Sequence, residues 1–181
     1  MHNISVLMTN CSFYHSLQLT SAKLLADKIR DVSTEKPTEV GQASKLVATI
    51  SGKVYRFPPN EINVKSLSLI LVDPQPHYEI AAYARDATKS DPRFTSPIGL
   101  DGIYGKGERT DYGLDGRIGG FPRVNAVKGS WQDDRTFVID RLVLGQVVPA
   151  ERWTLTFDGE KVNVRFKFWR GELSADGETD G

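Results

Sequence analysis

Ser33 and Lys36 form the most reactive pattern in the sequence, a serine followed three residues later by a lysine. Such a pair performs nucleophilic catalysis when one helical turn brings the two side chains together and burial makes the lysine a base. Here Lys36 precedes Pro37, which disfavours helical backbone, and Glu35 and Glu39 stabilise the charged form of the lysine. We therefore expect a solvated linker at this position and no catalytic residue.

The cysteine and histidines give no stronger indication of chemistry. Cys11 is the only cysteine, so the chain forms no disulfide within itself. No acidic residue lies close in sequence to orient His15 as a base for Cys11, and a lone thiol is usually a small core residue. His2, His15 and His77 lack the spacing of metal ligands. We expect no metal and no cofactor.

The segment from Gly99 to Gly120 holds half of the chain's 16 glycines. A phosphate-binding loop would require a helix directly after the glycines, and none is predicted there. The composition instead predicts a long surface loop with a short strand around Ile103-Tyr104. In that loop four side chains are candidate contacts with a partner or ligand: Arg109, Tyr112, Asp115 and Arg117.

Large aromatic residues recur along the second half of the chain. Trp131 and Trp153 belong either to the core or, if they face a lumen, to the lining of a small-ligand pocket. The chain has 23 basic and 23 acidic residues and a formal net charge of zero. Without a basic stripe, nucleic acid is not an expected partner.

The spacing of the apolar residues, which indicates the elements that position these side chains, changes near Pro37. Before it, Ile4–Met8 predicts a buried strand, and apolar residues at spacings of three and four predict an amphipathic helix over Ser16–Val32. The predicted organisation is this strand and helix within residues 1–36, a linker at 37–45 and a β domain at 46–181. The apolar face of the helix, formed by Leu25, Ile29 and Val32, is a candidate contact with a second copy.

After the linker, apolar residues recur with a period of two, and no helical pattern follows residue 45. Asp133-Asp134 and Asp158-Gly159 lie where hairpin turns are expected. The runs predict about eight antiparallel strands in a mainly β, lipocalin-like barrel. The predicted strand segments are 46–50, 53–57, 66–71, 77–84, 124–131, 136–143, 153–157 and 162–168.

Several of these segments resemble a known family. Leu7-Met8-Thr9-Asn10 and the helix that follows resemble the closing strand and helix of the catalytic domain in β-lactamase-related serine hydrolases, the class C and penicillin-binding-protein-like enzymes. The rest of the chain resembles the small lipocalin-like barrel found behind that catalytic domain. The segments that carry this second resemblance are Ile50–Asn60, Ile98–Tyr104, Lys128–Val138 and Leu155–Gly159.

The resemblance implies that the catalytic elements of the family precede the part represented here. On this interpretation the chain is not an enzyme on its own. It is a non-catalytic accessory domain that shapes substrate access or stability, with the hydrolase domain of a full-length parent as its partner. The alternative is a lipocalin-like module that binds a small apolar ligand.

The sequence shows no export or membrane signal. The N-terminus has no basic region, and Ile4–Met8 is too short for the apolar part of a signal peptide. No apolar run approaches the ~20 residues of a membrane helix. A cytoplasmic location is therefore the default expectation, and a membrane is not an expected partner.

Overall fold

The computed structural model describes residues 44–84, 88, 90–112, 118–144, 151–168 and 170–179. In 108–112 and 118–123 it describes the backbone alone. The chain divides into two units, Met1–Lys36 and Pro37–Gly181, and all described residues belong to the second. The strand and helix predicted in residues 1–36, and most of the predicted linker, lie outside the described residues.

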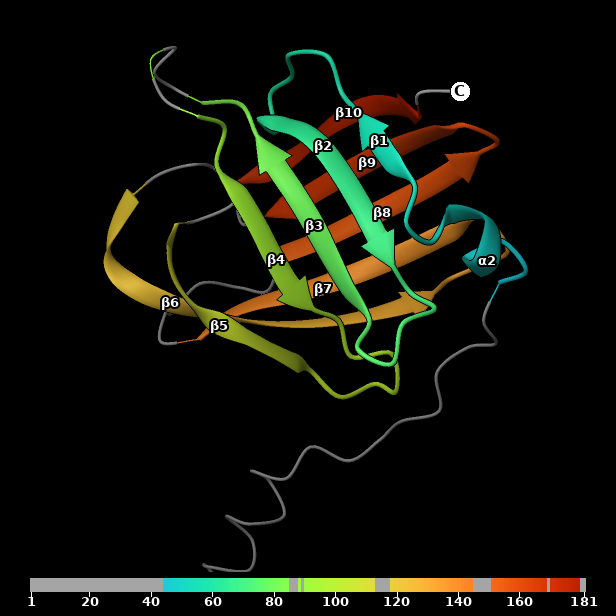
Figure 1. Ribbon diagram of the computed structural model, residues 1–181, viewed down its shortest axis with the longest axis horizontal. Coiled ribbons are helices and arrows are strands. Elements are labelled where there is room, and N and C mark those ends of the chain that lie inside the picture. Colours follow the sequence, from blue (N-terminus) through green and yellow to red (C-terminus); the bar gives the residue numbers. More distant parts are fainter. Residues whose placement is uncertain are drawn as a thin grey trace, which may run out of the picture. The chain divides into compact units, whose positions relative to one another are not determined.

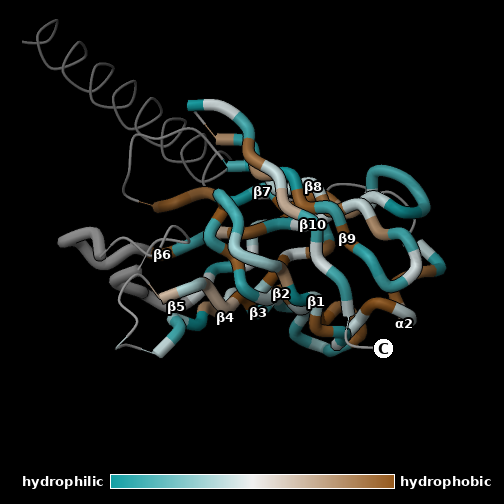
Figure 2. The backbone as a smooth tube through the Cα atoms, turned by 90° about the horizontal axis from the view of Figure 1, so that it is seen from above, coloured by the Kyte–Doolittle hydropathy of each residue, from teal (hydrophilic) through white to brown (hydrophobic). Residues whose placement is uncertain are grey.

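The described residues form ten antiparallel strands in one sheet (Figure 1). The sheet folds into two layers, with β1–β4 facing β7–β10, and Figure 2 shows the same two layers from above. The strands are β1 (Val54–Arg56), β2 (Val64–Ile70), β3 (His77–Ala82), β4 (Arg93–Pro97), β5 (Gly105–Tyr112), β6 (Ile118–Trp131), β7 (Thr136–Leu144), β8 (Glu151–Asp158), β9 (Lys161–Phe168) and β10 (Gly171–Thr179).

The order of the strands nearly closes the sheet into a barrel. It runs β4-β3-β2-β1-β10-β9-β8-β7-β6-β5, so the first strand pairs with the last. The two end strands of this order, β4 and β5, follow each other along the chain and form no ladder with each other in the described residues. We call the line between them the seam. The predicted mainly β, lipocalin-like antiparallel barrel is confirmed, with ten strands in place of about eight.

The two end strands nevertheless approach each other closely at the seam. A Cβ atom on Gly105 would lie 2.9 Å from the carbonyl oxygen of Pro97, and one on Gly107 would lie 2.8 Å from Ser96 Oγ. Larger residues at these two positions of β5 would push the strands apart. The two glycines therefore allow β4 and β5 to lie close together although no hydrogen-bonded ladder joins them in the described residues.

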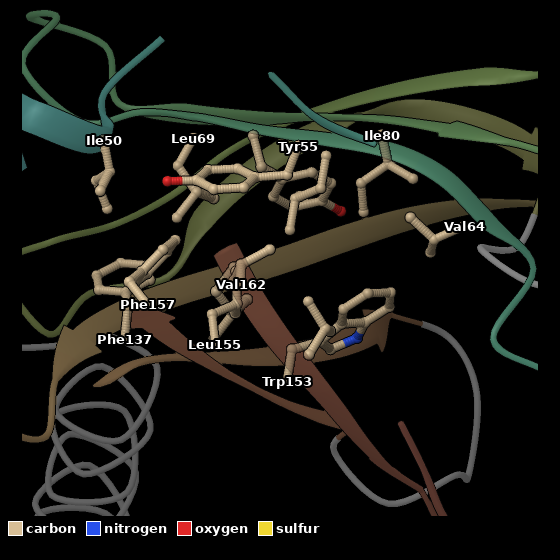
Figure 3. Close-up of a cluster of buried hydrophobic side chains, with 14 of the residues drawn as sticks. Ile50, Tyr55, Val64, Leu69, Ile80, Phe137, Trp153, Leu155, Phe157 and Val162 are labelled. Carbon is tan, nitrogen blue, oxygen red and sulfur yellow. The ribbon is translucent and has the colours of Figure 1, made fainter. Parts of the chain in front are cut away.

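Apolar side chains from both layers pack together in the interior of the barrel (Figure 3). The Tyr55 and Phe157 rings lie 5.6 Å apart, and the Trp131 and Phe137 rings 5.2 Å apart. Burying one such side chain contributes about 1.5–3 kcal/mol to folding. Ile50 belongs to this core and is fully buried.

Ile50 belongs to the short helix α2 (Val47–Ile50), where the sequence predicted a strand over 46–50. That prediction is wrong for a physical reason. The Ser44 hydroxyl accepts a hydrogen bond from the Leu46 amide and donates one to the Asp134 carbonyl, which starts a helical turn there. These contacts and the burial of Ile50 outweigh the strand preference of the branched residues.

The prediction of a long glycine-rich loop is also wrong over much of its length. Residues 105–112 form β5, and β6 begins at Ile118. Glycine by itself weakens a strand, but at Gly105 and Gly107 the absence of a side chain allows β5 to lie close to β4. The predicted turns at Asp133-Asp134 and Asp158-Gly159 are confirmed, the second with Gly159 at a φ of 62°.

Candidate functional site

Five polar side chains come from strands on both sides of the seam, and their burial and contacts place them within the barrel. Tyr78 on β3 is directly opposite Ser96 on β4, and Arg141 on β7 is directly opposite Glu151 on β8. Asn125 on β6 completes the group through a hydrogen bond to Arg141. We call these five residues the interior polar cluster.

Arg141 is the centre of this cluster. Its side chain is only 4% exposed, and its Nη1 lies 3.1 Å from Oε2 of Glu151. Its Nε donates a hydrogen bond to Asn125 Oδ1 at 3.3 Å. A buried arginine requires such partners because an isolated charge is costly to remove from water. Glu151 therefore balances the charge of Arg141 within the barrel.

The hydrogen bonding of the cluster is incomplete. Arg141 Nη1 and Glu151 Oε2 lie within ion-pair distance but are not aligned as a hydrogen bond. Ser96 Oγ makes no well-aligned hydrogen bond among the described residues, although its interaction with the Tyr78 hydroxyl lowers the pKa of that tyrosine. The indole Nε1 of Trp153, which is 3% exposed, also has no partner among the described residues. Each buried polar atom without a partner costs about 1–3 kcal/mol. Folded proteins retain few of them without a reason.

Tyr78 adds a hydroxyl group to the same region. Burial raises the pKa of Tyr78, and the positive charge of Arg141 acts in the opposite direction. A tyrosine whose pKa is above its usual value of about 10 keeps its proton at neutral pH. Tyr78 can therefore donate a hydrogen bond to an acceptor held near Arg141.

Apolar residues complete the surroundings of these groups. In Figure 3 the indole of Trp153 points toward Ile80 and Val64 of the opposite layer. Trp153 also lies 4.8 Å from the ring of Phe166. The arrangement offers donors and one carboxylate beside an apolar interior, which suits binding of a molecule with one polar end. The described residues contain no group of three or more side chains that would hold a metal ion.

The contact residues predicted from the sequence are found in different places. Trp131 packs against Phe137 and Phe157, whereas Trp153 lies inside the barrel near the interior polar cluster. Arg109 and Tyr112 belong to β5, so their predicted position in a loop is wrong; their side chains are not described. Asp115 and Arg117 lie outside the described residues.

Sequence reasoning missed all five residues of the interior polar cluster. The available signal is the period-two pattern of β7, in which Arg141 takes the place of an apolar residue after Phe137 and Ile139. Glu151 similarly precedes Trp153 and Leu155 at a spacing of two. A charge in phase with buried residues indicates an interior charge.

The described part of the chain is a lipocalin-like antiparallel β-barrel with charged residues inside. No protein-family model and no curated protein matches the sequence. Among the described residues, no helix has the length and apolar character required to cross a membrane.

Two solved structures have a similar fold. As-p18, an extracellular fatty acid binding protein, is 12% identical, with a TM-score of 0.45 over 71% of this chain and 94% of that chain. The fluorescent protein UnaG is 11% identical, with a TM-score of 0.44 over 74% of this chain and 98% of that chain. At these values the similarity concerns the architecture of the barrel and indicates nothing about a ligand.

Proposed function

We propose that this barrel binds a small, mostly apolar molecule that carries one polar or negatively charged group. The observation that carries the proposal is Arg141, a charged residue 4% exposed inside the barrel whose Nη1 has no aligned hydrogen bond. A group that accepts hydrogen bonds from this guanidinium would satisfy a donor that the protein leaves unsatisfied.

The chemistry of arginine favours an acceptor with two oxygen atoms. The guanidinium presents five N–H donors in a planar fork, which matches a carboxylate or a similar group. Asn125 occupies the Nε donor, and Glu151 faces Nη1. The side chain of Glu151 is 22% exposed although its Oε2 is buried, and the proposal requires this carboxylate to leave Nη1 when a ligand carboxylate binds.

The rest of the ligand should be apolar because the side chains around the cluster are apolar. Val127, Ile139 and Trp153 are buried next to Arg141 in the register. Burying apolar surface contributes roughly 25 cal/mol per Å². A ligand that consists of the polar group alone would lack this contribution to its binding free energy.

A fluorescent fatty acid, dansylaminoundecanoic acid, and its methyl ester test the proposal. We expect the acid to bind with a blue-shifted emission, and Arg141→Gln to weaken it by about tenfold or more, the equivalent of one charge-assisted hydrogen bond. The matched control is Arg152→Gln on the neighbouring strand, where Arg152 is 56% exposed and pairs with Asp140. Affinity that is equal in the wild type and in Arg141→Gln, with both proteins folded by circular dichroism, contradicts the proposal.

A second candidate function is an accessory role beside a β-lactamase-related catalytic domain. This candidate rests on the resemblance of the sequence segments alone, and two of them, Ile98–Tyr104 and Lys128–Val138, are joined by the hydrogen bond from the Gly129 amide to the Gly99 carbonyl.

Two experiments test the accessory role. The DNA upstream of the gene should encode, in frame, a hydrolase domain with a Ser-x-x-Lys pattern; a stop codon directly before Met1 contradicts this. Incubation with a fluorescent penicillin should leave the isolated chain unmodified by mass spectrometry. A covalent adduct on Ser33 contradicts the non-catalytic interpretation.

A further inference from the structure

The indole nitrogen of Trp153 is a buried hydrogen-bond donor that a ligand carboxylate at Arg141 would not use. Trp153 is 3% exposed, and its Nε1 has no partner among the described residues. An indole N–H donates a hydrogen bond and cannot accept one. Because a buried donor without an acceptor destabilises the folded protein, a bound molecule that supplies an acceptor at this point would remove that penalty.

The neighbours of Trp153 in both layers are apolar. It is directly opposite Ile139 on β7 and Phe166 on β9. In Figure 3 its indole, with the nitrogen in blue, faces Ile80 and Val64 of the opposite layer. None of these four residues provides a side-chain acceptor for the indole N–H.

Glu151 is the nearest acceptor side chain along β8, and it is already engaged. It precedes Trp153 by two residues, so the two side chains lie on the same face of the strand. Its Oε2 is 3.1 Å from Nη1 of Arg141. Turning this carboxylate toward Trp153 would leave the buried guanidinium without its counter-charge. The indole N–H therefore needs an acceptor from elsewhere.

Packing holds the indole in place. The Phe166 ring lies 4.8 Å from the Trp153 ring, at an angle of 49°. Ile139, directly opposite on the other side, is buried as well. A donor that is already held in one orientation loses little conformational freedom when an acceptor arrives. Trp153 is therefore suited to recognise one position along a bound molecule.

The strands set the separation between Trp153 and the interior polar cluster. Two residues along a strand span roughly 7 Å, and this spacing separates Trp153 from Glu151 on β8. The same spacing separates Ile80, which faces the indole, from Tyr78 on β3. Both layers therefore place the indole roughly 7 Å from the cluster, measured along the strands.

We propose that Trp153 selects, among the apolar acids of the proposed function, those that carry a second oxygen acceptor along the apolar chain. The inference rests on the proposed function, because the acid group must occupy the interior polar cluster for the chain to reach Trp153. A keto oxygen is the simplest such acceptor. Burying an unpaired keto group weakens binding, so an interior without the Trp153 donor would prefer the unsubstituted acid.

Stearic acid and two oxostearic acids test the proposal by competition with dansylaminoundecanoic acid. One oxostearic acid has its carbonyl in the half of the chain nearer the carboxylate, and the other has it in the far half. The first should bind about three- to tenfold tighter than stearic acid, the equivalent of one neutral hydrogen bond. The second should bind more weakly than stearic acid, because its carbonyl is buried away from Trp153.

Trp153→Phe should abolish or reverse the preference for the first oxostearic acid. The matched control is Trp131→Phe, which changes a tryptophan that packs against Phe137 and Phe157 and should retain the preference. The quantity compared is the ratio of the two affinities within each variant, so a general loss of packing affects both acids alike. An unchanged ratio in Trp153→Phe overturns the proposal.

The indole N–H resonance gives a direct readout in isotope-labelled protein. The chain has three tryptophans, and Trp153→Phe assigns the signal of Trp153. This signal should move downfield with the first oxostearic acid and not with stearic acid. The same shift with stearic acid would make Glu151 the acceptor and overturn the proposal. Binding of both acids without preference overturns this inference alone, whereas binding of neither acid overturns the proposed function with it.

Discussion

Removing Glu151 from its ion pair with Arg141 should destabilise the protein more than removing Arg141. Arg141 is 4% exposed and Glu151 is 22% exposed, although their atoms are only 3.1 Å apart. Glu151→Gln leaves a buried guanidinium without a counter-charge, and arginine cannot lose its proton to escape the penalty. Arg141→Gln leaves unpaired the carboxylate of a side chain that is less buried, at 22% exposed.

The magnitudes follow from this difference in burial. Removing one partner of a buried pair costs about 3–5 kcal/mol, so Glu151→Gln should lie in that range. Arg141→Gln should cost less, about 1–3 kcal/mol, the loss of hydrogen bonds by a partly exposed group. Replacing both residues by leucine should be close to neutral or stabilising because the pair then needs no desolvation.

Urea unfolding followed by tryptophan fluorescence measures these differences, since Trp131 and Trp153 lie against the core and the interior. The exposed pair of Arg152 and Asp140 provides the reference: Arg152→Gln should cost less than about 1 kcal/mol. If Glu151→Gln and Arg141→Gln lower the free energy of unfolding equally, or if Arg141→Gln lowers it more, the difference in burial between the two side chains does not determine their contributions to stability.

Three further predictions concern the barrel itself. Gly129→Ala should destabilise the fold by about 1–3 kcal/mol through overpacking, because its Cβ would lie 2.4 Å from the Phe137 ring; the melting temperature measures this, and an unchanged value contradicts it. Phe157→Ala should lower the free energy of unfolding in urea by about 3–5 kcal/mol because Phe157 is fully buried. A decrease below 1 kcal/mol would contradict the place of Phe157 in the apolar core. The backbone hydrogen bond from Arg135 holds the pKa of Asp133 below its ordinary value of 3.8. The stabilisation from this carboxylate is therefore complete above that value and lost as the pH falls through the lowered pKa, so an Asp133→Asn variant should show a smaller decline in urea midpoint below pH 4 than the wild type.

The strands with alternating residues could be predicted from the sequence. In β9, Val162 and Val164 are buried while Lys161 and Arg165 are exposed, as the period of two requires. The turn before β9 follows from Gly159, which adopts the positive φ that glycine tolerates best. Local pattern was sufficient here because each residue's burial depends on its place in one strand.

Other strands could not be predicted because their stability comes from neighbours. β10 fully buries only Ala175 and Gly177; Leu173 is partly buried against the core, and most of the other residues are polar. It forms a strand because β9 and β1 supply backbone hydrogen bonds along its two edges. Gly177 is required there since a Cβ would lie 2.7 Å from the Phe57 ring. None of these contacts is visible in the sequence of β10 itself.

The interior polar cluster could not be predicted because the apolar pattern of β7 does not show which of its two faces is the inner one. In β7 both faces contain apolar residues, with Phe137 and Ile139 on the inner face and Val138 and Leu142 on the outer face. The sequence therefore places Arg141 on the face of Phe137 and Ile139 but does not say that this face is the inner one. The partner Glu151 becomes evident only through the register of β7 with β8.

The charged pair inside the barrel fits a binding site better than a core alone. Arg141 and Glu151 lie on β7 and β8, on one side of the seam, and Tyr78 and Ser96 lie on β3 and β4, on the other side. A barrel whose interior served only as a core would gain stability by replacing Arg141 and Glu151 with apolar residues. The indole Nε1 of Trp153, two residues from Glu151, is also buried without a partner among the described residues. A charged pair beside an unsatisfied donor supports the proposal that this part of the interior binds a ligand.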